Sequence, residues 1–313
     1  MPRNLQNGAA AIVALEDPAG KPGAPREPRL RVAITGSHGL IGTALSALLR
    51  SEGHTVIRVV RGRPAPGDLL WDPERGQIDA EGLEAMDAVV HLAGENLASG
   101  RWTAQRKRRL AESRTVGTSL LASTLARLDA PPGVLVSASA VGYYGDRGDE
   151  ILTEASPPGT GFLSKLSQAW EEAADPARAA GIRVVHPRFG VVLSPKGGAL
   201  ARLLPVFRLG LGGRLASGRQ WMSVQTLDDT VAAIRYMVTH SGLTGPVNVV
   251  CPAPLTNAQF TRELAAALGR PALFRVPAVA LRVLLGEMAD ETLLASQRVV
   301  PERLLESGFR FRD

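Results

Sequence analysis

The apolar positions of this chain occur in short runs that alternate with stretches of helical spacing. Leu30 to Ile34 is a mostly apolar, β-prone run, typical of a buried parallel strand. Isoleucine and leucine then recur at helical spacing from Ile41 to Leu49, and Thr55 to Val60 is a second β-branched run. This order predicts a strand, a helix and a second strand between Arg29 and Arg63.

The same alternation continues along the chain. We expect further strands at Ala88 to Ala93, Val134 to Ser137 and Arg183 to His186, and helices at Thr103 to Asp129 and Phe162 to Ala180. After Pro187 the elements become shorter and glycine-containing loops separate them. In that part we expect helices at Thr226 to His240 and Asn257 to Leu268, and a strand at Val247 to Val250.

Strands that alternate with helices predict the fold class α/β, with a Rossmann-type doubly wound parallel sheet and a smaller C-terminal α/β substrate part. Residues 1–28 are rich in Pro, Gly and Ala without sustained periodicity, which predicts a disordered or loosely attached tail. Residues 29–187 then form the Rossmann domain. Residues 188–313 form the substrate-binding part, which we expect to share elements with the first domain.

A glycine turn lies between the first strand and the first helix. Thr35 precedes three glycines spaced Gly36-x-x-Gly39-x-x-Gly42. A diphosphate needs backbone N–H groups without bulky side chains in the way, and a helix N-terminus adds positive dipole. The alternative is an ordinary glycine-rich turn, but the surrounding strand and helix favour a dinucleotide site. The predicted cofactor-binding residues here are Thr35, Gly36, Ser37, Gly39, Leu40, Ile41 and Gly42, with Leu92, Ala93 and Gly94 after the next strand.

The end of the second strand distinguishes the two nicotinamide dinucleotides. NAD sites place a carboxylate there for the ribose 2′-hydroxyl, whereas NADP sites use arginine near the 2′-phosphate. Between Gly53 and Gly67 the sequence has no carboxylate, and Arg61 follows the strand directly. The predicted cofactor is therefore NADP(H), and residues 29–187 are the predicted NADP-binding domain.

Composition narrows the function classes further. The chain has 313 residues, 45% of them hydrophobic, and its single cysteine, Cys251, excludes an internal disulfide. A net charge of +6 and a pI near 10.1 would suit nucleic acid, but the arginines are scattered and aromatic residues are only 4%. We expect a cytoplasmic protein without a membrane span or nucleic-acid partner. An anionic small molecule is the favoured substrate class, and the oligomeric state stays open, a homodimer included.

Several long segments together resemble one family. They are HLAGENLASGRWTAQRKRRLAESR, VSASAVGYYG, GGALARLLPVFRLGLGGRLASGRQWMSVQTLDD and GPVNVVCPAPLTN. They are similar to the epimerase-family branch of the extended short-chain dehydrogenase/reductases. The region from about residue 265, above all Val276 to Phe311, resembles the DUF1731 domain of that branch. The resemblance implies an NADP(H)-dependent oxidoreductase or a nucleotide-sugar-epimerase-like enzyme.

The resemblance also implies which residues carry the chemistry. The superfamily uses a serine and a Tyr-x-x-x-Lys pair, in which the tyrosine moves a proton and the lysine binds the nicotinamide ribose. Ser139 and Lys165 match that pattern, whereas Gly161 stands at the tyrosine position. Tyr143 and Tyr144 are the candidate replacements, and Tyr143 is our predicted proton donor. Each residue also has a purely structural interpretation. Ser139 would cap a helix or turn, the two tyrosines would pack or cap the loop, and Lys165 would be a solvated helix lysine.

Substrate contacts are expected from arginines and tryptophans near the carboxyl ends of the strands, because ligands bind there in open α/β sheets. The predicted set is Asn96, Arg101, Trp102, Arg188, Arg219 and Trp221. The run from Arg106 to Arg109 is interpreted as a solvated basic helix face. His91 and His186 lack companion ligands at metal spacing, so no metal is predicted.

The missing tyrosine leaves a second function open. A dinucleotide-binding sensor or regulator without catalytic activity would need the glycine turn and Arg61 but no proton donor. The retained Ser139 and Lys165 favour the enzyme. A nucleic-acid-binding protein is a more distant third hypothesis.

Overall fold

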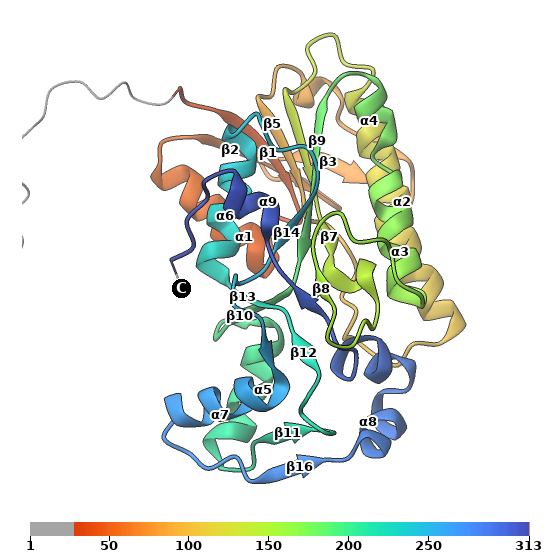
Figure 1. The fold of residues 1–313 in the computed structure, drawn as a ribbon. Coiled ribbons are helices and arrows are strands. Elements are labelled where there is room, and N and C mark those ends of the chain that lie inside the picture. The colour runs from red at the N-terminus through yellow and green to blue at the C-terminus, as the bar shows by residue number, and fades with distance from the viewer. Residues whose placement is uncertain (1–27, 313) are drawn as a thin grey trace, which may run out of the picture.

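The computed structural model describes residues 28–312, so the predicted tail lies outside the described residues except for Pro28. A nine-stranded sheet forms its centre (Figure 1). Its strands run in the order β14-β9-β6-β5-β1-β2-β3-β4, with β7 also paired to β9, and only β3 and β4 pair antiparallel. The strands are β1 (Arg31–Thr35), β2 (Thr55–Val60), β3 (Leu69–Asp72), β4 (Gln77–Ile78), β5 (Ala88–His91), β6 (Val134–Ser137), β7 (Ser139–Ala140), β9 (Arg183–Phe189) and β14 (Gly245–Val249).

Helices cover both faces of this sheet (Figure 1). On one face lie α1 (Leu40–Ser51) and α6 (Leu227–Thr239), and on the other lie α2 (Ala104–Leu125), α3 (Phe162–Glu172) and α4 (Asp175–Ala179). Each face has its own buried apolar cluster, because the central parallel strands are apolar on both sides. The doubly wound Rossmann-type sheet predicted from the sequence is confirmed.

Two elements differ from their predicted bounds around a proline. The helix expected through Ala180 is interrupted after Glu172, because Pro176 has no N–H and its ring clashes with the carbonyl four residues earlier. Conversely, β9 continues through Pro187 to Phe189. On one side of β9, Pro187 is paired with Val247 of β14. On the other side it lies between the residues of β9 that pair with β6 and those that pair with β7. The strand therefore tolerates the missing N–H of proline there.

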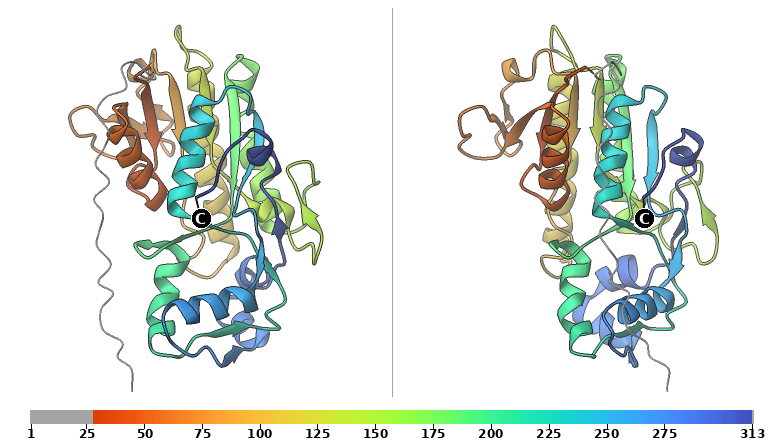
Figure 2. Two further views of the ribbon diagram at one scale, coloured as in Figure 1. Left: turned by 60° about the vertical axis from the view of Figure 1, so that its left-hand side comes forward. Right: turned by 90° about the vertical axis from the view of Figure 1, so that its left-hand side faces the viewer.

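A smaller lobe lies beyond the carboxyl ends of the strands (Figures 1 and 2). The chain passes directly from the large sheet into this lobe, because β9 ends at Phe189 and the next strand begins at Val191. Short two-stranded pairs link its helices. Its elements are β10 (Val191–Ser194), α5 (Gly198–Arg208), β11 (Gly213–Leu215), β12 (Trp221–Met222), β13 (Val224–Thr226), β15 (Leu255–Thr256), α7 (Asn257–Ala267), β16 (Phe274–Val276) and α8 (Ala278–Leu285).

The predicted second part returns to the first sheet in several places. It supplies α6, the edge strand β14 and the short helix α9 (Glu302–Glu306). Phe309 is buried in the cluster that also contains Val32 and Leu45, and the Arg312 N–H donates to Asp229 Oδ1 at 3.0 Å. The remaining short elements are η1 (Glu81–Leu83), η2 (Val141–Tyr144), β8 (Ile151–Leu152), the short π-helix η3 (Ala289–Leu293) and β17 (Arg298–Val299), which pairs with β8.

Within residues 28–312, no helix combines the length and the apolar character that crossing a bilayer requires. The same residues contain no group of three or more histidine, cysteine or acidic side chains arranged to hold a metal ion.

Candidate functional site

The glycine turn between β1 and α1 is shaped by close backbone contacts. Gly36 has φ of 66°, and a Cβ there would lie 2.8 Å from the Leu92 carbonyl carbon. A Cβ on Gly42 would collide with the Gly36 oxygen. Gly39 caps α1 without a side-chain hydrogen bond, which leaves the first N–H groups of the helix available. The Ser37 hydroxyl is buried without a partner among the described residues. The turn therefore fits a diphosphate.

Thr35 joins the carboxyl ends of two neighbouring strands. Its hydroxyl oxygen lies 2.7 Å from His91 Nδ1 and accepts from the N–H groups of Leu92 and Ala93 at 3.2 and 3.3 Å. Burial lowers the pKa of His91 to about 4, so the ring is neutral near pH 7. Thr35 Oγ1 and His91 Nδ1 therefore share one hydrogen bond, and together with the two backbone bonds it fixes the loop that begins at Leu92.

A cavity of about 500 Å³ opens beside this loop. It brings Arg61 together with Ala93 and Gly94, three of the predicted cofactor residues. The other lining residues come from β3 and α2 and the loops beside them: Trp71, Pro73, Glu74, Glu95, Arg109, Glu112, Ser113 and Val116.

The two arginines near the end of β2 have different surroundings. Arg58 forms two 2.8 Å hydrogen bonds to the Asp68 carboxylate, and this contact lowers the pKa of that carboxyl group. Arg61 is exposed and its side chain makes no hydrogen bond or ion pair with residues 28–312. Of these two arginines, Arg61 is therefore the one whose side chain is available to a ligand.

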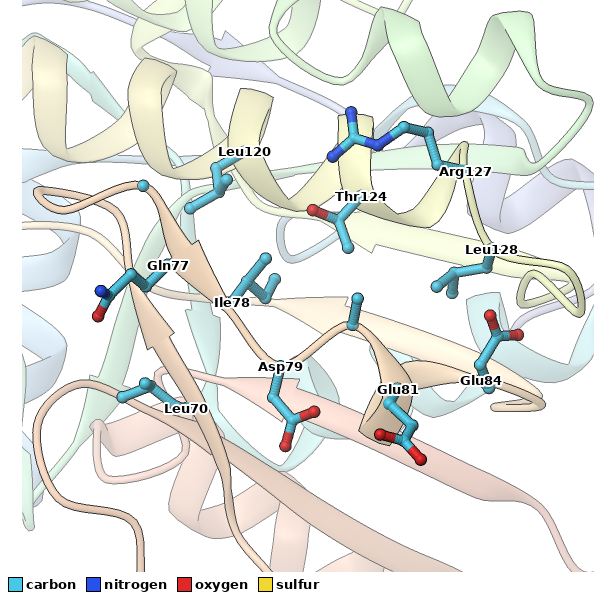
Figure 3. Close-up of a pocket in the computed structure, with 12 residues that line it drawn as sticks. Leu70, Gln77, Ile78, Asp79, Glu81, Glu84, Leu120, Thr124, Arg127 and Leu128 are labelled. Atoms are coloured by element: carbon cyan, nitrogen blue, oxygen red, sulfur yellow. The ribbon is translucent and has the colours of Figure 1, made fainter.

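A larger hollow of about 740 Å³ lies between the β3–β4 hairpin and α2 (Figure 3). None of the predicted cofactor or catalytic residues lines it. Two of its carboxylates cap local backbone, since Asp79 accepts from Gly82 N–H and Glu84 accepts from the N–H groups of Asp129 and Ala130. The smaller cavity beside Arg61 is thus the better candidate, despite its size.

Ser139 belongs to a buried network at the end of the sheet. Its hydroxyl donates to Glu171 Oε1 at 2.6 Å. The same carboxylate accepts two 2.8 Å bonds from the Arg188 guanidinium, whose side chain is only 3% exposed. The structure therefore joins a predicted catalytic residue and a predicted substrate residue through a carboxylate. Arg188 lies inside the protein, where its charge is matched by Glu171.

The two adjacent tyrosines differ in their environment. Tyr144 is fully buried, and its hydroxyl donates to Asn248 Oδ1 at 2.7 Å and accepts from Arg188 at 3.0 Å. Burial raises the pKa of Tyr144 to about 12. Tyr143 is half-buried, its ring faces Arg188, and its hydroxyl has no hydrogen-bond partner within residues 28–312. Of the two phenols, only that of Tyr143 is available to a substrate.

Lys165 lies on α3, one turn after Gly161, and is exposed without a side-chain partner in the described range. Gly161 caps α3 with φ of 101°. The carboxylate of Glu291, from η3, accepts from the N–H groups of Phe162 and Leu163. The start of this helix is thus covered by the C-terminal part of the chain.

The predicted substrate residues do not form one group. Asn96 caps its own loop through the Ala98 N–H, and Arg101 and Arg219 are exposed. Trp102 is buried with Phe162 near α3, and its indole donates to the Leu97 carbonyl. Trp221 instead donates to Asp149 and stacks with Arg298.

The interpretation of Arg106 as part of a solvated basic face is wrong. Its side chain is 15% exposed and forms an ion pair with Glu95, because the loop after β5 folds back over the start of α2. Arg109 pairs with the same carboxylate at 3.0 Å.

Sequence reasoning missed Glu171, Glu291 and Trp71. Glu171 is 32 residues from Ser139, and Glu291 is 128 residues from Leu163, so no local spacing relates them. Trp71 had a signal, since it is a large aromatic residue within the turn-rich stretch from Pro64 to Arg75 that follows the second strand. Its ring reaches Gly117 on α2, where a Cβ would lie 2.8 Å from the indole.

Comparison with known proteins gives two family matches. Residues 32–251 match the NAD dependent epimerase/dehydratase family, and residues 276–313 match a domain of unknown function, DUF1731. The epimerase family protein Mb2239 of Mycobacterium bovis is 48% identical over 281 residues, covering 90% of this chain and 93% of that protein. The human epimerase family protein SDR39U1 is 37% identical over 287 residues, covering 90% and 95%.

Solved structures agree with these matches. The crystal structure of human SDR39U1 isoform 2 with NADPH is 36% identical, with a TM-score of 0.83 over 90% of this chain and 95% of that one. A nucleoside-diphosphate sugar epimerase from Corynebacterium glutamicum is 38% identical with a TM-score of 0.77. The alignment covers 91% of this chain and 56% of that longer one.

Proposed function

The chain belongs to the NAD dependent epimerase/dehydratase family, with a C-terminal DUF1731 domain, and on that premise we propose that it is an NADP(H)-dependent oxidoreductase or epimerase-like enzyme. Arg61 carries the cofactor assignment. It borders the cavity that includes Ala93 and Gly94, and it has no carboxylate partner in the described structure. A 2′-phosphate would supply the missing anion. The human relative that was crystallised with NADPH supports this choice.

The diphosphate would bind at the glycine turn. Gly36, Gly39 and Gly42 keep side chains out, and the start of α1 offers backbone N–H groups. The buried Ser37 hydroxyl adds a donor that lacks a partner in residues 28–312. The nicotinamide, when bound, supplies or accepts hydride. The protein has to bind and orient the cofactor and the substrate, and it has to transfer a proton.

Proton transfer is assigned to Tyr143. Its hydroxyl is accessible, while Arg188 against its ring fixes the orientation of the phenol. Ser139 is assigned an orienting role, because its hydroxyl proton is directed to Glu171 and its oxygen can still accept a hydrogen bond. Lys165 is assigned to the ribose, as its exposed ammonium has no protein partner in the described range. The substrate is proposed to be a small anionic molecule, with Arg101 and Arg219 as exposed cations.

A dinucleotide-binding sensor is the second candidate. The engagement of the Ser139 hydroxyl with Glu171 and the glycine at residue 161 favour it, because both reduce the usual proton-transfer machinery. In a sensor, the dinucleotide would be the signal and no substrate would be turned over.

One experiment separates the two candidates. NADPH and NADH are titrated by fluorescence, and the NADPH complex is then mixed with a panel of carbonyl compounds in single-turnover mode. We expect preference for NADPH and oxidation of the bound cofactor by at least one compound. Tight NADPH binding without any oxidation supports the sensor, and preference for NADH removes the Arg61 assignment.

A further inference from the structure

The start of α3 has a backbone conformation that excludes the superfamily tyrosine. Gly161 has φ of 101° and ψ of 178°, a region that is essentially restricted to glycine. The space that a Cβ would need is occupied by the Glu291 carboxylate, which a built Cβ would overlap. A tyrosine at residue 161 would therefore require both a different backbone and a displaced Glu291.

Glu291 replaces the missing cap of this helix. Its two carboxylate oxygens accept from the Phe162 and Leu163 N–H groups, both at 2.9 Å. These donors have no intrahelical acceptor, and Gly161 has no side chain to serve them. A carboxylate at a helix N-terminus is stabilised by the hydrogen bonds and by the helix dipole.

The residues before Glu291 make independent contacts with the same region. Lys107 of α2 forms a 2.7 Å ion pair with Glu287 and lies over the Phe162 ring. Met288 packs against the apolar cluster that contains Trp102 and Phe162. The segment from residue 286 to residue 293 is thus attached to the starts of both α2 and α3.

The start of α3 is in turn bonded to the Tyr143 loop. The Tyr143 carbonyl accepts from Gly159 N–H at 3.0 Å and from the Ser164 hydroxyl at 2.8 Å. Lys165 follows Ser164 directly. A shift at Gly161 would therefore reach both Tyr143 and Lys165.

We propose that Glu291 is a positioning residue of the site, and that its carboxylate and a tyrosine side chain at residue 161 are alternative occupants of one space. The C-terminal segment thereby completes the active site: it caps α3 and holds Lys165 and the Tyr143 loop in place. The roles of Lys165 and Tyr143 rest on the proposed function, whereas the capping role of Glu291 does not.

Amide hydrogen exchange tests the capping role directly. Glu291→Ala should lose protection at the Phe162 and Leu163 amides, whereas the matched control Asp290→Ala should keep it, because Asp290 pairs with Arg282 instead. Added acetate should restore protection in Glu291→Ala, and chloride at equal ionic strength should not. Unchanged protection in Glu291→Ala, or equal loss in Asp290→Ala, overturns the proposal.

A double-mutant cycle tests the shared space. Gly161→Ala should lower the melting temperature in the natural background by about 2–4 °C more than in the Glu291→Ala background, because the collision with the carboxylate is then absent. Equal penalties in both backgrounds overturn the claim.

Cofactor and turnover measurements test positioning. In Glu291→Ala single-turnover oxidation should fall by about 10²-fold and recover with acetate. The NADPH dissociation constant should rise by a smaller factor, because Lys165 is assigned to the ribose. Unchanged single-turnover oxidation in Glu291→Ala would overturn the positioning role. If the natural protein itself fails to bind NADPH, the proposed function fails, and the exchange experiment still decides the capping role.

Discussion

The guanidinium carbon of Arg188 lies over the Tyr143 ring, 3.4 Å from its centre. Arg188 is itself held by two 2.8 Å hydrogen bonds to Glu171. The ring is therefore fixed by a cation–π contact, while the hydroxyl remains available for other partners. Ring and hydroxyl can accordingly be tested separately.

Tyr143→Phe keeps the ring and removes only the hydroxyl. If Tyr143 is the proton donor, turnover should fall by a factor of roughly 10²–10⁴, because a general acid usually contributes that much. The melting temperature and the NADPH dissociation constant should stay nearly unchanged, since the hydroxyl has no hydrogen bond within residues 28–312. Single-turnover oxidation of bound NADPH measures the effect. Normal turnover would mean that the proton comes from another group or from water.

Tyr144→Phe is the matched control, and we expect the opposite result. It removes the hydrogen bond to Asn248 and leaves Arg188 without one of its acceptors. Buried polar groups that lose a partner cost about 1–3 kcal/mol each, so the free energy of unfolding should fall by that order. Chemical denaturation measures it. An unchanged midpoint would show that the Asn248 and Arg188 groups find other partners.

Arg61→Ala should weaken NADPH binding more than NADH binding. One charge-assisted contact is worth about 1.5–3 kcal/mol, which is roughly a 10- to 150-fold change in the dissociation constant. Arg63→Ala is the control, because Arg63 is exposed nearby but does not line the cavity. Fluorescence titration decides between the variants. Equal losses for both dinucleotides would contradict a 2′-phosphate contact.

Gly39→Val should abolish dinucleotide binding while leaving the protein folded. A Cβ on Gly39 would be 3.2 Å from the Gly36 oxygen, a tight contact that a small adjustment relieves. The same change at Gly42 would collide with backbone and is expected to unfold the turn. Circular dichroism and NADPH titration should be measured together. Retained binding in a folded Gly39→Val protein would place the diphosphate elsewhere.

Acid should destabilise the protein partly through His91. Burial lowers its pKa to about 4, against 6.5 for an exposed imidazole. Between these values the unfolded state binds more protons, so stability rises with pH across this window and falls on acidification. The contribution of one such group is at most about 3 kcal/mol. His91→Asn can keep the bond to Thr35 and should flatten the melting temperature between pH 6.5 and 4. An unchanged slope would contradict this assignment.

The elements that local patterns encode were predictable. The glycine turn, β6 and the start of α7 follow from short apolar runs, glycines and caps, and Thr256 forms the full capping box with Gln259. The candidate site could not be predicted in the same way, because it depends on contacts between residues that are far apart in the sequence. Glu171 and Glu291 sit on ordinary polar helix positions, and only the folded chain brings them to Ser139 and Gly161. Gly161 looked like the loss of a catalytic group, whereas the structure shows why glycine is required there.

The return of α6, β14 and Phe309 to the first sheet has a consequence for the order of events during synthesis. The strands β1 to β9 emerge from the ribosome with the edge of β9 unpaired and with the apolar face beneath α6 uncovered. Such surfaces promote aggregation, and pairings between distant residues form slowly. A fragment that ends at residue 187 would keep this vulnerable state permanently. The nascent chain would benefit from chaperone protection until residues 227–311 have been made.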